Sequence, residues 1–431
     1  MKKILIITYY WPPSGGGGVQ RWLKFVKYLP QFGWEPIVYS PENPEYPSID
    51  ESLQKDVSPV LKHIKRPIFE PYNFYKSFVG LKKNERINTG FLSERKKPKK
   101  AENIAVWIRG NLFIPDARKF WINPSVSYLK KYLRENPVDL IVTTGPPHSM
   151  HLIGLGLKKK LGVKWIADFR DPWTNIDFYK ELKLSNWANK KHHKLEQKVI
   201  NNADGIIGVG KGYIKNLLPI PKETPVAIIT NGYDHEDFQG LEIEKNGQFS
   251  ICHFGSMNKT RNPIGLWKAL ASLKKSNPTL IANLKVKLYG KVDHIIFDSV
   301  EELGISELVE SVDYLAHEDM LKELINSSLL LLVINNIENG GRLIPGKVFE
   351  YIGTGKAILG IGPVECEVAE ILEESKSGEM FEWEDGDQIE KFILDQLESK
   401  DGLIQNEEKL KYSRKFLTEK LVRFFSDVIG E

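Results

Sequence analysis

Four consecutive glycines, Gly15–Gly18, separate a continuously apolar segment from an amphipathic one near the start of the chain. The apolar segment, KILIITYY at 3–10, lacks alternation with polar residues, which is typical of a parallel strand buried on both faces. After the glycines, apolar residues recur at helical spacing: Val19, Trp22, Leu23, Val26 and Leu29. EPIVYS at 35–40 then supplies a second strand. A strand–helix–strand unit of this kind requires parallel pairing and constrains the chain to an α/β fold.

The same pattern recurs along the chain and predicts two domains. Apolar segments at 138–144, 164–169, 204–210 and 226–230 predict a doubly wound domain over 1–238, with a basic and aromatic insertion at about 44–123. A second series at 249–255, 284–290, 309–315, 328–334 and 356–362 predicts a second domain over 239–410. Residues 411–431 predict a final amphipathic helix. We therefore expect two Rossmann-like domains that face each other across a cleft.

The bulk composition excludes several classes of protein. The net charge of +4 is small for a nucleic-acid-binding protein, so we expect no nucleic-acid partner. Cys252 and Cys366 have no metal-ligand spacing, which favours reduced thiols. The N-terminal apolar run is too short for a signal peptide, and no apolar run is long enough to span a membrane. We expect a cytoplasmic chain.

The glycine loop predicts a ligand site. Ligands of open parallel sheets bind beyond the carboxyl ends of the strands, and the glycines stand at such an end. Gly16 and Gly17 would let an anionic ligand approach the backbone and the following helix N-terminus. A flexible turn is the alternative. The dinucleotide-binding pattern is incomplete because Gln20 replaces its third glycine, although Glu42 follows the second strand and keeps an NAD-dependent oxidoreductase open.

The start of the second domain predicts a diphosphate site. The segment HFGSMNKTRNP places Gly255 and Ser256 after a strand, followed by Lys259 and Arg261 before a helix. Two cations at this edge would stabilise the charge that develops on a departing diphosphate. We therefore expect Lys259 and Arg261 to be catalytic.

A second glycine-rich segment of this domain, NGGRLIPGKVFEYIGTGKAILG, predicts a ribose site. Gly346 precedes a helix, and Lys347 and Glu350 share one face of that helix at a spacing of three. A carboxylate at Glu350 would accept hydrogen bonds from both hydroxyls of a ribose. A helix N-terminal turn with a solvent-exposed ion pair is the alternative.

At these residues the chain resembles the retaining glycosyltransferases of family 4, which have the two-domain GT-B fold. The resemblance is carried by the glycine loop, by NGYDHEDF at 231–238, by FGSMNKTRNP at 254–263 and by GKVFEYIGTGKAIL at 346–359. It implies transfer from a nucleotide sugar, such as a UDP- or GDP-sugar, to a saccharide or lipid-linked acceptor in polysaccharide or glycolipid synthesis. It also implies no obligatory metal cofactor and a final helix, 411–431, that returns to the first domain.

One departure from the family pattern concerns a second carboxylate. The family commonly carries two glutamates eight positions apart, and the position eight residues before Glu350 is Arg342. The loop backbone with Arg342 or Lys347 would then hold the sugar. A nucleotide-sugar epimerase of the same fold, or a protein that binds a nucleotide sugar without turnover, stays open.

The first domain supplies further candidates. His148 and His151 follow the strand at 138–144, and the resemblance implies that a histidine here faces the sugar; we prefer His148. Asp168, Arg170 and Asp171 end the next strand, so that they and His151 are expected on the acceptor side. The alternatives are helix capping by the histidines and a structural Asp–Arg pair. The Asp-x-Asp of EDGDQ, 384–388, predicts a helix cap and no metal site.

A basic segment predicts contact with an anionic membrane. Within 76–100 nine basic residues stand against two acidic ones, with aromatic residues interleaved and followed by Trp107. Such a segment would rest on anionic lipid at the inner face of the membrane. A solvated insertion is the alternative.

Overall fold

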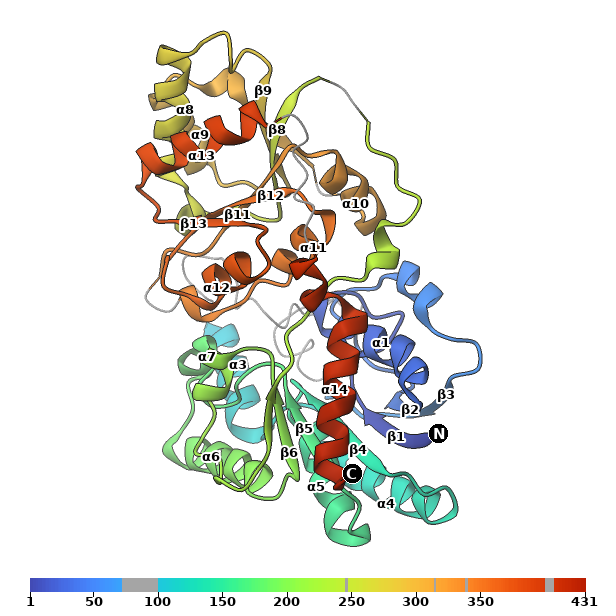
Figure 1. Ribbon diagram of the computed structural model, residues 1–431. Coiled ribbons are helices and arrows are strands. Elements are labelled where there is room, and N and C mark those ends of the chain that lie inside the picture. The colour runs from blue at the N-terminus through green and yellow to red at the C-terminus, as the bar shows by residue number, and fades with distance from the viewer. Residues whose placement is uncertain (72–99, 245–246, 314, 338–339, 400–406) are drawn as a thin grey trace. The chain divides into compact units, whose positions relative to one another are not determined.

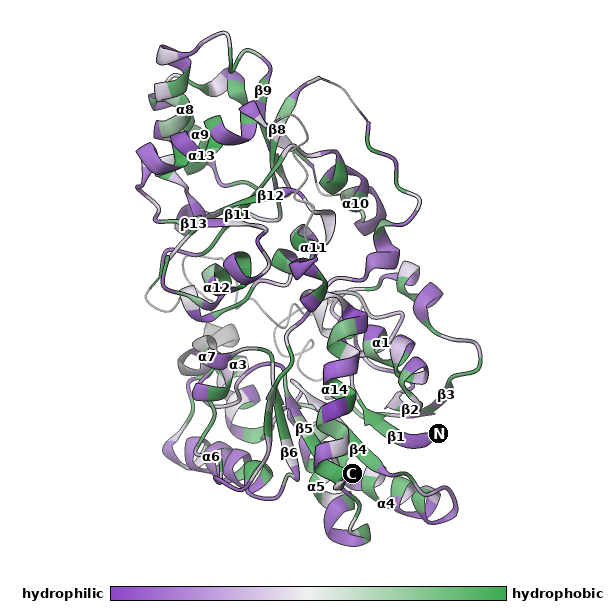
Figure 2. Cartoon of the chain, in the orientation of Figure 1, coloured by the Kyte–Doolittle hydropathy of each residue, from purple (hydrophilic) through white to green (hydrophobic). Residues whose placement is uncertain are grey.

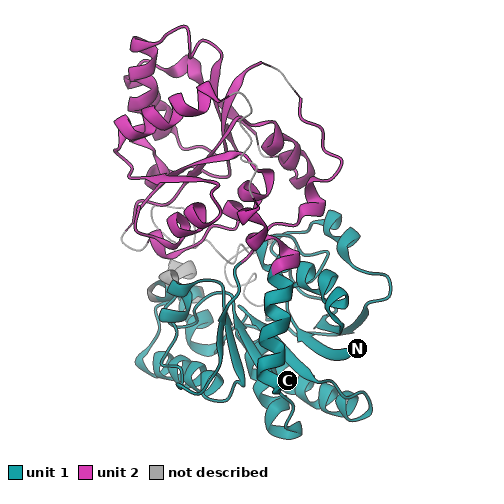
Figure 3. Cartoon of the chain, viewed as in Figure 1, with its two compact units in different colours: residues 1–230, 417–431 teal, residues 231–416 magenta. Residues whose placement is uncertain are grey.

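The computed structural model describes residues 1–71, 100–244, 247–313, 315–337, 340–399 and 407–431. These residues form two compact units (Figure 3). Unit 1 contains residues 1–230 and 417–431, and unit 2 contains 231–416. Each unit is built on one parallel sheet with helices on its faces (Figure 1), which confirms the predicted α/β class.

Unit 1 has a seven-stranded sheet in the order β3-β2-β1-β4-β5-β6-β7. Its strands are β1 (Lys2–Ile7), β2 (Trp34–Pro41), β3 (Lys62–Arg66), β4 (Leu140–Gly145), β5 (Trp165–Phe169), β6 (Gly205–Gly208) and β7 (Val226–Ile228). Its helices include α1 (Gly17–Tyr28), α3 (Lys100–Leu112), α4 (Lys119–Glu135), α5 (Ser149–Leu161), α6 (Asn186–Ile200) and α7 (Lys211–Lys215).

The two faces of this sheet bury separate cores. Leu5 and Ile7 of β1 pack with residues of α4 and α5, whereas Ile4 and Ile6 pack with residues of α1. Side chains alternate between the faces of a strand, so a continuously apolar strand fills both cores at once. The apolar run at 3–10 therefore has the structural role that the sequence predicts for it.

The C-terminal helix α14 (Arg414–Ile429) contributes to the core of unit 1. Leu421 and Phe425 are fully buried, and the ring of Phe425 lies edge-on to Trp34 with centroids 5.3 Å apart. Residues 417–431 belong to unit 1 for this reason.

Unit 2 has a six-stranded sheet in the order β10-β9-β8-β11-β12-β13. Its strands are β8 (Phe249–Phe254), β9 (Leu284–Tyr289), β10 (Val309–Val312), β11 (Leu329–Val333), β12 (Ala357–Ile361) and β13 (Gly378–Phe381). Its helices are α8 (Ile264–Ser276), α9 (His294–Glu302), α10 (His317–Asn326), α11 (Lys347–Thr354), α12 (Glu367–Glu374) and α13 (Gly386–Glu398), counted over the described residues.

The segment NGYDHEDF lies in unit 2, whereas the sequence placed the domain boundary after Phe238. The backbone of Tyr233 accounts for this difference. Its N–H donates to Tyr412 O (3.1 Å), and its carbonyl accepts from Arg414 N (2.7 Å). These bonds hold the segment against the end of unit 2, so unit 1 ends at Thr230.

The hydropathy of the chain follows this architecture, with hydrophobic strands in both sheets (Figure 2). Within the described ranges, no helix is both long and apolar enough to cross a bilayer. The described part of the 44–123 insertion includes β3 and α3. Most of the basic segment 76–100 lies outside the described residues, and the membrane contact predicted for it is not tested.

Candidate functional site

The glycine loop of unit 1 is held at one end and open at the other. Gly15 N donates to Ser48 O (3.0 Å), and Gly16 is the N-cap of α1. A Cβ added at Gly17 would meet no atom within 4 Å. The N-terminus of α1 therefore has room for a ligand beside Gly17.

Arg170 lies against this loop. A Cβ at Gly18 would meet the Arg170 guanidinium, so the two residues are in close contact. Arg170 Nη2 donates to Pro146 O (3.3 Å), and its Nε lies 3.6 Å from Asp171 Oδ2. The predicted residues Arg170 and Asp171 are thus neighbours of the glycine loop.

Asp168 has a different placement, because its carboxylate is buried in the core. It accepts hydrogen bonds from Arg21 Nη2 (2.9 Å), Trp22 Nε1 (2.7 Å) and Thr144 Oγ1 (2.8 Å). Burial raises the pKa of Asp168, but Arg21 and these hydrogen bonds outweigh burial and hold the pKa below its ordinary value. A carboxylate with these partners has no access to an acceptor, so the predicted acceptor-side position of Asp168 is corrected to a structural one.

The two histidines also differ. His151 is fully buried and shares a hydrogen bond of 2.9 Å with Thr143 Oγ1, so its predicted acceptor-side position is corrected as well. Burial lowers the pKa of His151 to about 3. His148 stacks on Trp173, with ring centroids 4.6 Å apart and planes within 4°. Burial, and to a smaller extent the neighbouring histidines and Arg170, hold the pKa of His148 well below its ordinary value, so the ring is neutral at pH 7.

His148 lines a cavity of about 200 Å³ within unit 1. Aromatic side chains and cations line the cavity together with the histidine: Tyr10, Arg109, Phe113, Arg118, Trp173 and Tyr179. Sugars pack their apolar faces on aromatic rings, so a cavity of this composition suits a saccharide. Sequence analysis missed Trp173, although it ends the DFRDPW segment.

In unit 2, Gly255 follows β8 with a φ of +126°, a conformation that favours glycine. A Cβ here would collide with Nζ of Lys347, which donates to Phe254 O. Burial, with a smaller contribution from Arg261, lowers the pKa of Lys347 to about 8, and Glu350 opposes this shift. The ammonium of Lys347 therefore lies at the carboxyl end of β8, where the sequence predicts a phosphate.

Arg261 is fixed beside the same loop. Its Nε donates to Asn335 Oδ1 (2.7 Å) and its Nη1 donates to Ser256 O (3.0 Å). Lys259, in the same 3₁₀ turn, is exposed. The turn thus presents one fixed and one exposed cation near the loop.

Glu350 lies in the first turn of α11, which begins after Gly346. Its Oε1 is 3.3 Å from Nε2 of His317, and both side chains are partly buried. The solvent-exposed ion pair with Lys347, which was the alternative to a ribose site, does not form, because Lys347 bonds to the β8 carbonyl instead. Arg342 is exposed. His317 was missed by sequence analysis, although it begins the helix that follows β10 at the same sheet edge.

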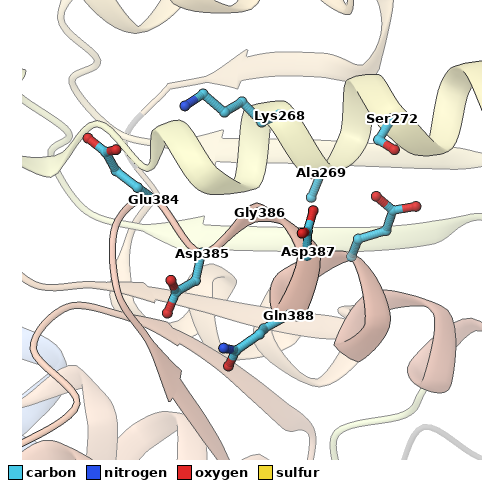
Figure 4. A pocket seen from close by; sticks show the side chains of 9 residues that line it. Lys268, Ala269, Ser272, Glu384, Asp385, Gly386, Asp387 and Gln388 are labelled. Carbon is cyan, nitrogen blue, oxygen red and sulfur yellow. The ribbon is translucent and has the colours of Figure 1, made fainter.

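The Asp-x-Asp segment lies elsewhere in unit 2, beside α8. Glu384, Asp385 and Asp387 line a hollow with Lys268 at the start of α13 (Figure 4). Asp385 is the N-cap residue, but its side chain accepts from Glu382 N (3.2 Å) and makes no cap bond to the helix. The predicted helix cap is therefore correct in position and wrong in its hydrogen bond. In the part of the chain that the structure describes, no group of three or more His, Cys, Asp or Glu residues is arranged to hold a metal ion.

Comparison with known proteins bears on this site. Residues 89–237 match the model of Glycosyltransferase Family 4. The match covers part of unit 1 and agrees with the resemblance found in the sequence. No curated protein sequence matches the chain.

Solved structures share the fold of this chain. A glycosyltransferase from Rickettsia africae ESF-5 has 14% identity and a TM-score of 0.59, and the alignment covers 100% of this chain and 99% of that chain. Sucrose-phosphate synthase from Thermosynechococcus elongatus has 14% identity and a TM-score of 0.58, with 100% of both chains covered. An E. coli structure, described as trehalose-6-phosphate bound with UDP-2-fluoro glucose, has 9% identity, a TM-score of 0.55 and coverage of 100% and 99%. At these identities the likeness concerns the fold, and it confirms the predicted GT-B class.

Proposed function

We propose that this glycosyltransferase moves a sugar from a nucleoside-diphosphate sugar to a hydroxyl acceptor, with retention at the anomeric carbon and without an obligatory metal. The observation that carries the proposal is the cationic edge of unit 2. Lys347 Nζ, Arg261 and the Gly255 loop lie together there, and Glu350 stands one turn along α11. A diphosphate needs such cations, and a ribose needs such a carboxylate.

Each residue of this edge has a proposed role toward the donor. Glu350 binds the ribose hydroxyls, with His317 as the group that orients its carboxylate. Lys347, Arg261 and Lys259 bind the diphosphate, together with the backbone of Gly255, Ser256 and Gly346. Arg342 is exposed and occupies the position at which the family carries its other glutamate; we assign it to the sugar.

Unit 1 supplies the acceptor side in this proposal. Gly16 and Gly17 contact the donor phosphates, and neutral His148 donates a hydrogen bond to the sugar. Arg170 and Asp171 contact the acceptor. The acceptor oxygen bonds to the anomeric carbon from the face that the diphosphate leaves. The bond between the anomeric carbon and the diphosphate oxygen breaks, and that oxygen takes the acceptor proton, so no protein nucleophile is needed.

The proposed acceptor is a saccharide or a lipid-linked saccharide in polysaccharide or glycolipid synthesis, handled by a cytoplasmic, peripheral membrane enzyme. The aromatic cavity beside His148 supports a saccharide. The E. coli structure, bound with a UDP-sugar analogue, supports a nucleotide-sugar donor.

A thermal-shift panel of UDP, GDP, ADP, CMP and NAD, each with and without EDTA, tests the donor. At a hundredfold excess over its Kd, a ligand adds about 2.7 kcal/mol, which raises Tm by a few degrees. We expect a shift with one nucleoside diphosphate that EDTA does not change. Glu350→Gln should abolish the shift, whereas Glu373→Gln, an exposed glutamate of α12, should retain it. A shift with NAD alone, or with no nucleotide, would overturn the proposal.

The reaction itself is tested by proton NMR of the product formed from the donor that the panel identifies. We expect the anomeric configuration of the donor to persist in the product. Conversion of the nucleotide sugar to its epimer without an acceptor would instead favour an epimerase. That alternative stays open because Arg342 stands where the family has a glutamate. Binding without any product would favour a protein that holds nucleotide sugars without turnover.

A further inference from the structure

One surface of unit 1 exposes several large aromatic side chains. Phe69 is 63% exposed, Phe120 is 43% exposed and Trp187 is 61% exposed. The rings of Phe69 and Phe120 meet edge to face with centroids 5.6 Å apart, and Phe113 lies 6.2 Å from Phe120. Contiguous exposed aromatic groups of this kind mark a surface that contacts something else.

Lysines lie among these rings. Lys119 Nζ is 5.0 Å from the centroid of Phe120 and 5.5 Å from that of Phe113, and Lys191 Nζ is 4.7 Å from the centroid of Trp187. Lys119 and Lys191 are also neighbours: burial lowers the pKa of Lys119, and the charge of Lys191 adds to that effect. Phe69, Phe113, Lys119, Phe120, Trp187 and Lys191 thus form one connected set, here named the aromatic–lysine surface.

Helix α6 extends this surface with positive charge. Trp187, Lys191, Lys194 and Lys198 recur at intervals of four, three and four residues, which places them on one face of the helix. Among the residues that the structure describes, Lys191, Lys194 and Lys198 form no ion pair with an acid. The single acid of α6, Glu196, is buried and accepts from Thr174 Oγ1 (2.5 Å). The exposed face of α6 is therefore cationic.

The aromatic–lysine surface also adjoins the cavity beside His148. Phe113 belongs to the surface and lines the cavity, together with Arg109 of α3. Helix α3 exposes Trp107 and Leu112 on either side of Arg109. A molecule held at the surface would have its polar end next to the cavity.

We propose that the aromatic–lysine surface docks on an anionic lipid bilayer and that the acceptor is a lipid-linked saccharide presented there to the cavity. Aromatic rings favour the interface between lipid tails and headgroups, while lysine ammonium groups reach the anionic headgroups. The combination of aromatic rings with lysine charges that no described acid neutralises is complementary to such a bilayer. A neutral protein partner would not match the charge. The identity of the acceptor rests on the proposed glycosyl transfer, whereas the docking itself does not.

Flotation of the full chain with vesicles tests the docking. The vesicles are pure phosphatidylcholine or a mixture with phosphatidylglycerol. The wild-type chain should float with the anionic vesicles and much less with the neutral ones. A Lys191→Gln/Lys194→Gln variant should bind anionic vesicles about thirtyfold more weakly, since each lysine near the surface is worth about 1 kcal/mol. A Phe120→Ser/Trp187→Ser variant should bind about tenfold more weakly or worse, because each ring loses buried apolar area.

Matched controls come from unit 2. Phe416→Ser removes a 45% exposed phenylalanine of α14, and Lys391→Gln removes an exposed lysine of α13. Both control variants should bind like the wild type. All variants should retain the nucleotide thermal shift, so a failure of the donor proposal is seen separately. The docking proposal would be overturned if the surface variants bound as strongly as the wild type. It would also be overturned if the wild type bound neutral vesicles equally well, or bound no vesicles at all.

Discussion

The polar residues at the carboxyl edges of the two sheets differ in how their side chains are bonded. In unit 1, Asp168 and His151 end up buried, and each is occupied by neighbours from its own core. In unit 2, Lys347 donates to Phe254 O, and Arg261 donates to Ser256 O and Asn335 Oδ1, so that among the described residues neither cation is paired with a carboxylate.

This difference distinguishes residues that hold the fold together from residues that can bind a ligand. A buried, fully bonded carboxylate such as Asp168 fixes strands β4 and β5 against α1, and it has no capacity left for a ligand. A cation that neutral carbonyls hold in place keeps its charge available to an anion. Unit 2 is therefore the side that we assign to the diphosphate, while unit 1 positions the glycine loop and His148.

The largest expected effect is the loss of stability when the buried ion pair of unit 1 is broken. Asp168→Asn leaves Arg21 buried without a counter-charge, which should cost about 3–5 kcal/mol of stability. Thermal unfolding measures the loss. Asp171→Asn, at a partly exposed pair 3.6 Å from Arg170, should cost less than about 1 kcal/mol. Equal losses from the two substitutions would contradict a structural role for Asp168.

The next largest effect tests whether the cations at the edge of unit 2 take part in the reaction. Arg261→Met removes a fixed guanidinium that would stabilise the departing diphosphate, so kcat should fall by roughly 10²–10³. Steady-state kinetics with the identified donor measure this change. Lys268→Met, at an exposed lysine of α8, is the control and should leave kcat unaltered. A kcat for Arg261→Met within a factor of two of wild type would remove this residue from the reaction.

A smaller effect follows from the pKa of Lys347, which burial lowers to about 8. A diphosphate binds the charged ammonium, so affinity should be highest below pH 8 and fall by up to about tenfold per pH unit above it. The same shift affects stability in the free protein. Between about pH 8 and the ordinary lysine pKa of about 10.4, Lys347 is protonated in the unfolded protein and neutral in the folded one, so its contribution to stability rises with pH. Titration calorimetry from pH 7 to 9 measures the affinity. Lys347→Met should flatten the profile, and an unchanged slope would exclude Lys347 from the site.

The smallest effect on stability concerns the glycine loop. Gly17→Ala places a methyl group in open space at the first turn of α1, so stability should stay equal or rise by about 0.4–1 kcal/mol. Turnover should nevertheless fall if a ligand approaches this backbone. Thermal unfolding and initial rates together decide the matter. Full activity in a stable Gly17→Ala protein would indicate a flexible turn, the alternative that the sequence left open.

Most of the strands that sequence analysis found are covered on both faces, although the partly exposed edge strands β7 and β10 were found as well. Continuously apolar runs such as residues 3–7 or 329–333 signal burial directly. Strand β3, with the sequence KHIKR, is largely exposed and lies at the edge of the described sheet beside β2, so it has no apolar run to detect. Strand β13 is four residues long and also lies at a sheet edge.

The site was predictable where function depends on local sequence. Gly255 follows β8 directly, Lys347 and Glu350 begin the helix α11 that comes after β11, and the rule that ligands bind at the carboxyl edge places them together. Asp168 was not predictable in this way, because Arg21 lies 147 positions away and meets it only when α1 packs on the sheet. His317 is an intermediate case, since it follows β10 at the same edge but its contact with Glu350 depends on how α10 and α11 pack.

Hydrogen–deuterium exchange of the chain, with and without the nucleoside diphosphate that the thermal-shift panel identifies, tests the assignment of the diphosphate to unit 2 most directly. We predict slower exchange in peptides that contain 253–261 and 346–352, and the same protection in the presence of EDTA. Peptides that contain Asp168 and His151 should exchange at the same rate in both states, because the proposed diphosphate site lies in unit 2. Protection confined to residues 145–171, or protection that requires a metal ion, would contradict the account.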